Sequence, residues 1–410
     1  MTNRAEKIIN DALLNLTDKF NEIDKISQFN TEKVLNAFAK NNIGSRHFAP
    51  SNGYGYDDVG RDTLETLFSD IMHTESSIVR PQIASGTHAL SLCLFGLLKY
   101  GDKCISATGE PYDTLQTVIG IAGNEPVSLK NLGINYKQVE LLNNSKIDID
   151  GVINAIDDKT KLIMIQRSKG YSIRNSILPS QMADLIKKIK KLDKNIIIMV
   201  DNCYGEFVRM DEPSDYGADI IVGSLIKNLG AGLAPTGGYI SGKQKYIDLI
   251  AAHLTAPGLG KELGSYEASY RLFYEGIFLA PHVVAQSLKI AMLFSEVFSK
   301  MGYRVFPDNT TDRSDIVQAI QFDDENMIIK FCQIIQSSSP IDSYAIPEPW
   351  DMPGYDNKII MASGSFVSGS SIELSADAPI RKPYTVYFQG GLTLEHGIFA
   401  LKNLLNRLIK

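Results

Sequence analysis

The chain has 410 residues, of which 44% are hydrophobic and 21% charged, so we expect a large globular core and not a fibrous or disordered protein. A formal net charge of −6 argues against a nucleic-acid partner, because binding to a phosphate backbone depends on a basic surface. The four cysteines lie far apart and lack a metal-binding spacing, so we expect buried, reduced thiols and no bound metal.

The N-terminal segment is predicted to be helical. Residues 4–40 repeat apolar side chains at helical spacing, which indicates one or two amphipathic helices. We expect this arm, residues 1–52, to pack on the body of the protein or on a second subunit. The segment lacks the apolar core and cleavage site of a signal peptide, and no later stretch holds about twenty uninterrupted apolar residues. We therefore expect a cytoplasmic protein with no membrane partner.

The middle of the chain alternates between helices and apolar strands. The pattern predicts helices from Asp62 or Thr63 to about His73, from Ser85 to near Tyr100, and over 180–193. The predicted strands cover 77–84, 103–109, 161–166, 195–201 and 219–224. Continuous Ile, Val and Met runs separated by helices are typical of a mostly parallel sheet covered on both faces. Residues 53–280 are thus expected to form a large α/β domain, with no regular element in the glycine-rich stretch after Ser224.

The pattern changes near residue 280. A long helix is predicted from Pro281 to Lys300, and a final helix from about 392 to 409. Between them, strands are expected over 303–307, 315–322, 358–366 and 384–391. Residues 281–410 should therefore form a smaller α+β domain.

Two charged residues follow neighbouring apolar strands, at the edge where open parallel sheets bind ligands. Asp201 ends its strand, so we expect its carboxylate to face a cation or a protonated ring nitrogen; a helix cap is an equal alternative. Lys227 lies three residues after Ser224 and could form a Schiff base with an aldehyde, although a lysine in a loop is more often solvated. A partly dry pocket with other cations would lower its proton affinity.

Two further strand ends carry candidate ligands. Ser85, Gly86 and Thr87 open a helix directly after a strand and could bind a phosphate, although Ser and Thr also cap helices for local reasons. Tyr112 could stack on a flat ring. A phosphate site, a ring site, a carboxylate for a ring nitrogen and a lysine for an aldehyde together match pyridoxal phosphate.

The motifs that carry these residues resemble one family. They are GYGYDDVGRDTLE, SGTHA, QRSKGY, VDNCYGEFV, GSLIKNLGAG and YFQGGLT. From about Tyr54 to the C-terminus the chain resembles the fold-type I pyridoxal phosphate enzymes of cysteine and methionine metabolism, methionine gamma-lyase and cystathionine beta-lyase, in the branch labelled aluminium-resistance proteins. The resemblance implies the aspartate aminotransferase-like fold of pyridoxal phosphate-dependent transferases. It also implies a carbon–sulfur lyase that acts on a sulfur-containing amino acid.

The resemblance also assigns roles to single residues. Lys227 would hold the aldehyde, Asp201 the ring nitrogen, and Tyr112 would stack on the ring and could donate a proton. The remaining residues implied for the cofactor are Ser85, Gly86, Thr87 and Ser224 at its phosphate, and Tyr54, Tyr56 and Arg61 at the phosphate of a neighbouring subunit. The active sites would then be shared in a homodimer, commonly within a tetramer. The family's carboxylate-binding arginine is missing beside YTVYFQGG, so Arg381 is our substitute, with Arg167 and Arg174 as rivals.

Other functions remain open from the sequence. An aminotransferase or an aldolase would share Lys227 and Asp201, and so would a protein that binds the cofactor without catalysis. Ser224 and Lys227 also form an SxxK pattern, but the accompanying S-D-N and K-T-G strings of that acyl-transfer class are missing. No GxGxxG follows a strand and opens a helix, which argues against a dinucleotide oxidoreductase.

Overall fold

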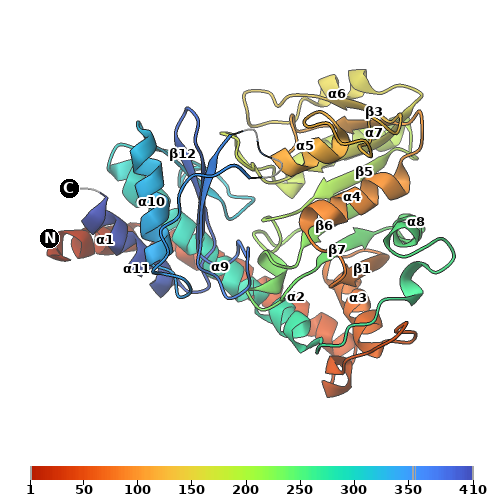
Figure 1. The fold of residues 1–410 in the computed structure, drawn as a ribbon, viewed down its shortest axis with the longest axis horizontal. Coiled ribbons are helices and arrows are strands. Elements are labelled where there is room, and N and C mark those ends of the chain that lie inside the picture. The colour runs from red at the N-terminus through yellow and green to blue at the C-terminus, as the bar shows by residue number, and fades with distance from the viewer. Residues whose placement is uncertain (1, 353–354, 356, 409–410) are drawn as a thin grey trace.

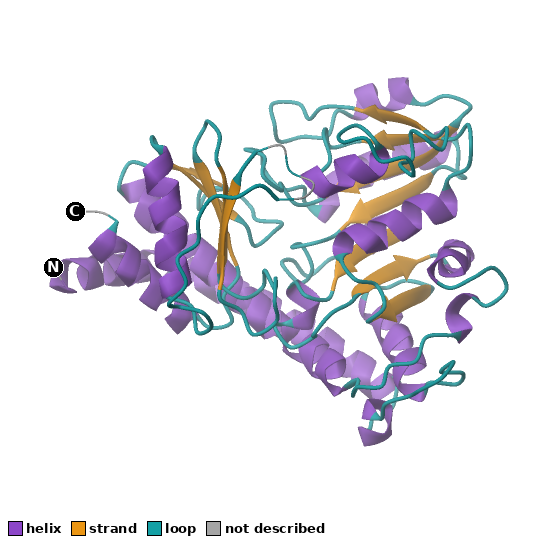
Figure 2. Cartoon of the chain, viewed as in Figure 1, coloured by secondary structure: helices purple, strands orange, loops and turns teal. Residues whose placement is uncertain are grey.

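The computed structural model describes residues 2–352, 355 and 357–408, and it contains two sheets with one long helix running between them (Figure 1). The larger sheet has seven strands in the order β1-β7-β6-β5-β4-β2-β3, and the smaller has five in the order β10-β11-β12-β9-β8. Helices lie against both sheets (Figure 2).

In the larger sheet every neighbouring pair is parallel except the two that involve β7, which is antiparallel to β1 and β6. Its strands are β1 (Ser76–Arg80), β2 (Lys103–Ser106), β3 (Asn135–Gln138), β4 (Thr160–Gln166), β5 (Ile197–Asp201), β6 (Ile220–Ser224) and β7 (Gly238–Gly242). The α-helices of this part are α3 (Val59–Ile71), α4 (Gly86–Leu97), α5 (Asp113–Ile119), α6 (Ile149–Ala155), α7 (Pro179–Leu192) and α8 (Gln244–Leu254). Short 3-10 turns lie at η1 (Ser45–Phe48), η2 (Pro213–Tyr216), η3 (Asn228–Gly230) and η4 (Gly260–Glu262). The predicted mostly parallel α/β sheet is confirmed.

The smaller sheet is antiparallel throughout. Its strands are β8 (Arg304–Phe306), β9 (Gln318–Gln321), β10 (Ile359–Ser363), β11 (Ser375–Pro379) and β12 (Thr385–Gln389), with helices α10 (Glu325–Ser337) and α11 (Leu394–Arg407). The predicted end of the last helix at 409 lies outside the described residues. The sequence pattern missed β11, because its residues, SADAP, include no run of large apolar side chains.

The N-terminal arm packs on the body of the same chain. Helix α2 (Thr17–Lys40) lies along the long helix α9 (Arg271–Lys300), and α1 (Thr2–Asn15) contacts both α9 and α11. Ion pairs join Glu6 to Lys402 and Asp24 to Lys289, both at 2.6 Å. Both chain ends therefore lie on the side of the smaller sheet (Figure 1).

The long helix begins earlier than the sequence predicts. Helix α9 starts at Arg271 and runs through Pro281, where the prediction placed its start. Before the proline, Phe273, Tyr274 and Ile277 are buried, so packing holds this half of the helix although a proline lacks the N–H of a regular turn. Our domain boundary between residues 280 and 281 stays a proposal, and α9 crosses it. Among the described residues, α9 is long and apolar enough to cross a bilayer, but most of this stretch is buried inside the protein.

Strand β7 corrects the expectation that the glycine-rich stretch after Ser224 holds no regular element. Its two terminal glycines lie where other parts of the chain come close. A Cβ at Gly238 would lie 2.7 Å from the Ile83 side chain, and one at Gly242 would lie 2.3 Å from the Asp219 carbonyl oxygen. These glycines are therefore explained by close packing around β7. In the sequence, however, such a glycine-rich segment looks like a loop.

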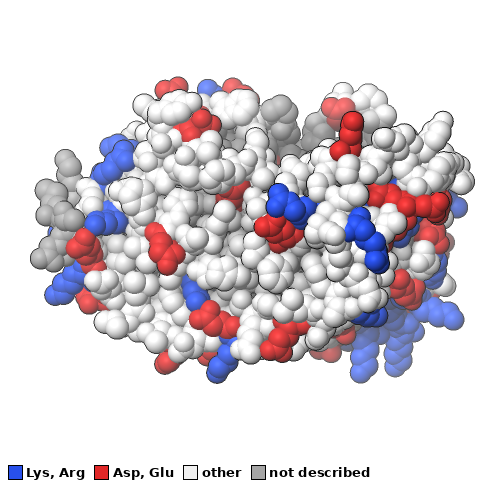
Figure 3. All heavy atoms as spheres, turned by 90° about the horizontal axis from the view of Figure 1, so that it is seen from below, with Lys and Arg blue, Asp and Glu red and all other residues white. Residues whose placement is uncertain are grey.

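The state of the cysteines and the distribution of surface charge can be compared with what the composition predicts. All four cysteines are buried and unpaired, as predicted. On the face shown in Figure 3, acidic and basic side chains intermingle over a largely uncharged surface, apart from a group of basic side chains at the lower right.

Candidate active site

A cavity of about 300 Å³ lies between the larger and the smaller sheet. It is lined by residues of both parts of the chain: Ser85, Gly86, Thr87, Tyr112, Asp113, Thr114, Gln166, Ser168, Gly170, Tyr171, Asp201, Cys203, Tyr204, Ser224, Ile226, Lys227, Val317, Tyr355, Asp377, Tyr387 and Gln389. The lining includes every residue predicted to contact the aldehyde, the ring or the phosphate of the cofactor within one subunit, Lys227 among them.

The sheet topology explains why these residues meet. Strands β4, β5 and β6 are parallel neighbours, and Gln166 at the end of β4 is paired directly with Asp201 at the end of β5. Asp201 is in turn paired with Val222 of β6, two residues before Ser224. The carboxyl ends of the three strands thus meet at one edge, which is where open α/β sheets bind ligands.

One end of the pocket is suited to an anion. Ser85 caps α4 by accepting a hydrogen bond from the His88 N–H at 3.0 Å, and the first helical residue is Gly86. A Cβ on Gly86 would lie 3.4 Å from the Cys203 sulfur and 3.5 Å from the Ser224 Cβ, so a side chain there would narrow the space between them. Free N–H groups at a helix N-terminus beside small hydroxyl residues favour a phosphate.

Asp201 carries a buried carboxylate that lines the pocket. One oxygen accepts a hydrogen bond from the Cys203 N–H at 3.1 Å. Burial raises the pKa of Asp201, and the positive charge of Lys227 opposes this shift without cancelling it. A carboxylate in this position is stabilised by a cation that enters the pocket.

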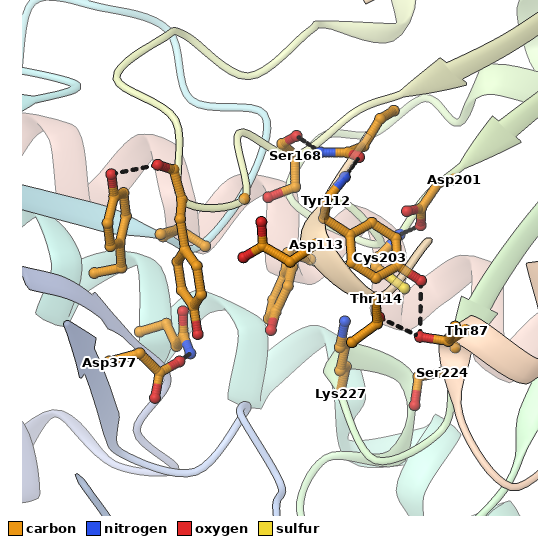
Figure 4. Close-up of a pocket in the computed structure, with 18 of the residues that line it drawn as sticks. Thr87, Tyr112, Asp113, Thr114, Ser168, Asp201, Cys203, Ser224, Lys227 and Asp377 are labelled. Carbon is orange, nitrogen blue, oxygen red and sulfur yellow. Dashed lines mark hydrogen bonds between the residues drawn. The ribbon is translucent and has the colours of Figure 1, made fainter. Parts of the chain in front are cut away.

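Lys227 extends into the pocket (Figure 4). Its Nζ lies 4.0 Å from the centre of the Tyr204 ring, a cation–π contact. Tyr204 holds this position with a backbone φ of +68°, which is rare for a tyrosine. Burial lowers the pKa of Lys227. The nearby Cys203, Tyr204 and Asp201 raise it by more than burial lowers it, so the pKa lies well above its usual value. This corrects the expectation of a lowered proton affinity, since the described lining contains no second lysine or arginine.

Tyr112 stands next to the anion end of the pocket. Its hydroxyl is hydrogen bonded to the Thr87 hydroxyl at 2.9 Å, and its backbone N–H donates to the Gln166 side chain at 2.9 Å. Burial, followed by the charge of Asp201, raises the pKa of Tyr112. The phenol therefore keeps its proton near neutral pH and can act as a donor.

These contacts allow a test of whether pyridoxal phosphate fits. The cofactor needs an anion site, a flat ring contact, an acid for its ring nitrogen and an amine for its aldehyde. The N-terminus of α4, Tyr112, Asp201 and Lys227 supply these four groups within one cavity. Because Gly86 leaves open the space that a side chain would fill, and the buried carboxylate of Asp201 lines the same cavity, the residues fit the cofactor.

The three predicted arginines lie outside the lining described above. Arg167 is fully buried and donates to Asn202 at 2.7 Å and to Ser314 at 2.9 Å, beneath the loop that follows Asp201. Arg174 donates to the carbonyl oxygens of Gln166 and Ser168, which line the pocket, and so supports its wall. Arg381 is exposed and lines a small adjoining cavity together with Asp113 and Tyr355.

The residues predicted to reach a neighbouring subunit also lie outside the cavity. Tyr54 and Tyr56 are 72% and 57% exposed, and their ring centres are 5.8 Å apart. The Arg61 guanidinium is buried and donates to the Gly55 carbonyl at 2.6 Å and to Asp62 at 2.8 Å.

The sequence reasoning missed the side of the pocket formed by the smaller sheet and two loops. Its members are Tyr171, Val317, Tyr355, Asp377, Tyr387 and Gln389. Tyr387 and Gln389 belong to the motif YFQGGLT, so this motif gave a signal. For Asp377 we find no signal in the sequence, because the strand that carries it was not predicted.

Glu206 is a fully buried glutamate in the segment that follows β5. Glu206 accepts a hydrogen bond from the Tyr239 hydroxyl at 2.8 Å, and burial raises its pKa to about 8. The pKa of Glu206 is thus higher in the folded protein than in the unfolded chain, where it is about 4.3. The contribution of the protonated Glu206 to the free energy of unfolding is therefore complete below about pH 4.3 and is lost as the pH rises through 8. Glu206→Gln should therefore gain stability over the wild type as the pH rises, by about 1.4 kcal/mol for each pKa unit of the shift.

Thermal unfolding of Glu206→Gln and of the wild type at pH 5, 7 and 9 would measure this gain. The exposed Glu267→Gln serves as the control, and its melting temperature should follow that of the wild type at all three values. A difference between Glu206→Gln and the wild type that stays constant from pH 5 to pH 9 would contradict the raised pKa.

Comparisons with known proteins agree with the fold. A family model described as methionine gamma-lyase matches residues 5–409. Protein YnbB of Bacillus subtilis is 50% identical over 376 residues, which are 92% of this chain and 89% of that protein. The structure of a carbon-sulfur lyase involved in aluminum resistance from Clostridium novyi is similar with a TM-score of 0.95 and 45% identity, over 99% of this chain and 96% of that chain. The pyridoxal-5'-phosphate dependent protein YhfS from Escherichia coli matches with a TM-score of 0.61 and 14% identity, over 93% and 95% of the two chains, which shows the fold alone.

Proposed function

This chain belongs to the methionine gamma-lyase family of pyridoxal phosphate-dependent enzymes, and we propose that it releases a thiol from a sulfur-containing amino acid as a carbon–sulfur lyase. The observation that carries the proposal is the placement of Lys227, Asp201 and the N-terminus of α4 around one cavity. Lys227 would bind the aldehyde covalently and Asp201 would hold the ring nitrogen. Ser85, Gly86, Thr87 and Ser224 would surround the phosphate. When bound, the cofactor supplies an electron sink for the bond broken at the α carbon of the substrate.

The residues of the chain then handle the protons. When the substrate amine takes the place of Lys227 at the aldehyde, Lys227 would leave as a neutral amine. Its Nζ, which lines the pocket, can then remove the α proton, although the pKa of the side chain without cofactor is raised. Asp201 stays ionised beside a protonated ring nitrogen, and this pair offsets the cost of burying the carboxylate. Tyr112 keeps its phenolic proton, so it can donate this proton to the departing sulfur.

The α-carboxylate of the substrate needs a cation, and Arg381 is our proposal for it. The lining residues that the structure describes include one cation, Lys227, which is assigned to the cofactor. Arg381 shares a neighbouring cavity with Asp113 and Tyr355, both of which also line the main pocket. Of the three predicted arginines, it is the one whose guanidinium is exposed and not tied to the protein interior.

We also propose a cytoplasmic homo-oligomer, a dimer or a tetramer, with shared active sites. Tyr54 and Tyr56 are exposed aromatic residues outside the cavity of their own subunit, which favours a contact with a second copy. The buried, unpaired cysteines favour a reducing compartment.

The proposed reaction is tested by incubating the holoenzyme with cystathionine, methionine or cysteine and measuring keto acid and free thiol. A lyase is expected to release keto acid together with a thiol, or sulfide from cysteine, without an amino acceptor. Keto acid that forms only when an acceptor is present would instead indicate an aminotransferase. A yellow holoenzyme that turns over none of these compounds would favour a protein that binds the cofactor without this catalysis.

A further inference from the structure

The wall of the pocket formed by the smaller sheet and its neighbouring loops has a composition of its own. It brings together three tyrosines, one carboxylate and one amide: Tyr171, Tyr355, Tyr387, Asp377 and Gln389. Figure 4 shows Asp377 on one side of the pocket, while Thr87 and Ser224 lie on the other side beyond Lys227. This wall therefore faces the substrate and not the phosphate of the cofactor.

The tyrosines are held in fixed positions around Asp377. The Tyr171 ring lies 5.1 Å from that of Tyr387 and 6.1 Å from that of Tyr355, centre to centre. The Tyr387 hydroxyl donates to the Tyr171 carbonyl oxygen at 2.6 Å, and Tyr387 is the direct cross-strand partner of Asp377. The Gln389 amide donates to an Asp377 oxygen at 3.2 Å. The carboxylate is thus oriented by its neighbours and is not a mobile surface group.

Asp377 has no counter-ion assigned to it among the charged side chains that line the pocket in the described structure. This lining holds three aspartates, of which Asp201 belongs to the ring nitrogen, and one lysine, which belongs to the aldehyde. Burial raises the pKa of Asp377 to about 6, and hydrogen bonds from Tyr171 and Gln389 together with the charge of Lys227 oppose the rise. The group is therefore largely ionised near neutral pH, in a place where an incoming cation would be attracted.

We propose that this wall selects an amino-acid substrate whose side chain ends in an ammonium group beyond the sulfur. The ammonium would pair with Asp377 and lie against the faces of the surrounding tyrosines, which attract cations through their ring quadrupoles. A side chain ending in a carboxylate would be repelled by the same wall. The inference rests on the proposed function, because it takes the wall as the binding site for the substrate side chain of a carbon–sulfur lyase.

Three cysteine conjugates test the inference. S-(2-aminoethyl)-L-cysteine carries the ammonium, S-propyl-L-cysteine has a neutral side chain of the same length, and S-carboxymethyl-L-cysteine carries a carboxylate. Titration of the holoenzyme, followed by the change in its visible absorption, gives a dissociation constant for each. We expect the aminoethyl compound to bind at least tenfold more tightly than the propyl compound, and the carboxymethyl compound to bind most weakly.

Substitution then locates the origin of this preference. In Asp377→Asn the ratio between the propyl and aminoethyl dissociation constants should fall from at least ten to near one. Asp113→Asn, which changes another aspartate of the lining, is the matched comparison and should keep more of the ratio. Equal binding of the two compounds by the wild type would overturn the proposal, and so would a ratio that persists in Asp377→Asn. The wild-type comparison decides even if Asp377→Asn does not fold.

Release of thiol is measured in the same samples and concerns the proposed function separately. If the binding order holds but no conjugate yields a thiol, the selectivity of the wall stands and the lyase proposal fails. If the neutral conjugate yields propanethiol while the binding order is absent, the lyase proposal stands and the selectivity fails.

Discussion

Lys227→Ala is expected to remove both the covalent link to the cofactor and the turnover of any substrate. The amine at this position is the proposed anchor of the aldehyde and the proposed base at the α carbon, so two functions are lost together. We expect turnover to fall on the order of 10⁴-fold, the upper range for a single acid–base group. After treatment with borohydride, the wild type should carry a pyridoxyl group on the peptide that contains Lys227, as read by mass spectrometry, and the variant should carry none.

The exposed Lys245→Ala is a suitable control, since it removes a lysine eighteen positions away, outside the pocket. This variant should retain the visible band, the borohydride label and the turnover of the wild type. A label found on a lysine other than residue 227 in the wild type would refute the assignment. So would a Lys227→Ala protein that turns over substrate at the rate of the wild type.

Asp201→Asn is expected to cause the second largest loss. An asparagine oxygen can still accept the hydrogen bond from the Cys203 N–H, so the turn after β5 should be kept while the negative charge is lost. Without that charge the ring nitrogen loses its proton, and the electron sink weakens. We expect kcat to fall by about 10²- to 10⁴-fold, with the cofactor still linked through Lys227.

The helix-cap alternative for Asp201 is wrong, because a turn and no helix follows β5 in the described structure. If Asp201 only stabilised this turn, Asp201→Asn would keep a kcat within about threefold of the wild type, a change of roughly 0.6 kcal/mol that would exclude a role at the ring nitrogen. Asp201→Glu restores the charge on a longer side chain and should recover part of the activity. A steady-state assay with borohydride labelling of each variant distinguishes loss of catalysis from loss of the cofactor.

The fold was predictable where burial on both faces of a sheet leaves a clear pattern. The runs that became β4, β5 and β6 are continuous in Ile, Val and Met, and their ends place Asp201 and Ser224 at one edge. Strand β7 was missed because close packing requires Gly238 and Gly242. From the sequence alone, glycines required by packing cannot be distinguished from glycines in a loop. Helix α9 was predicted too short because a proline normally marks the start of a helix, and tertiary contacts extend this helix to the N-terminal side of Pro281.

Some residues of the candidate site were likewise predictable from the sequence, and others were not. The residues proposed for the cofactor follow strand ends or open a helix, and local sequence rules find such positions. Tyr204 was missed because nothing in a sequence marks a tyrosine with a positive φ. Asp377 was missed because it reaches the pocket from a strand more than a hundred residues away, and this approach depends on how the two sheets are placed.

The pocket between the two sheets separates two tasks along the chain. The residues proposed for the cofactor within one subunit lie between Ser85 and Lys227, whereas most of the wall that faces the substrate comes from residues 355–389. Changes in this later segment can therefore alter substrate preference and leave the cofactor contacts intact. The same reaction chemistry can in this way be redirected during evolution, or by an engineer, to a new amino acid through replacements on β11, on β12 and at Tyr355 before β10.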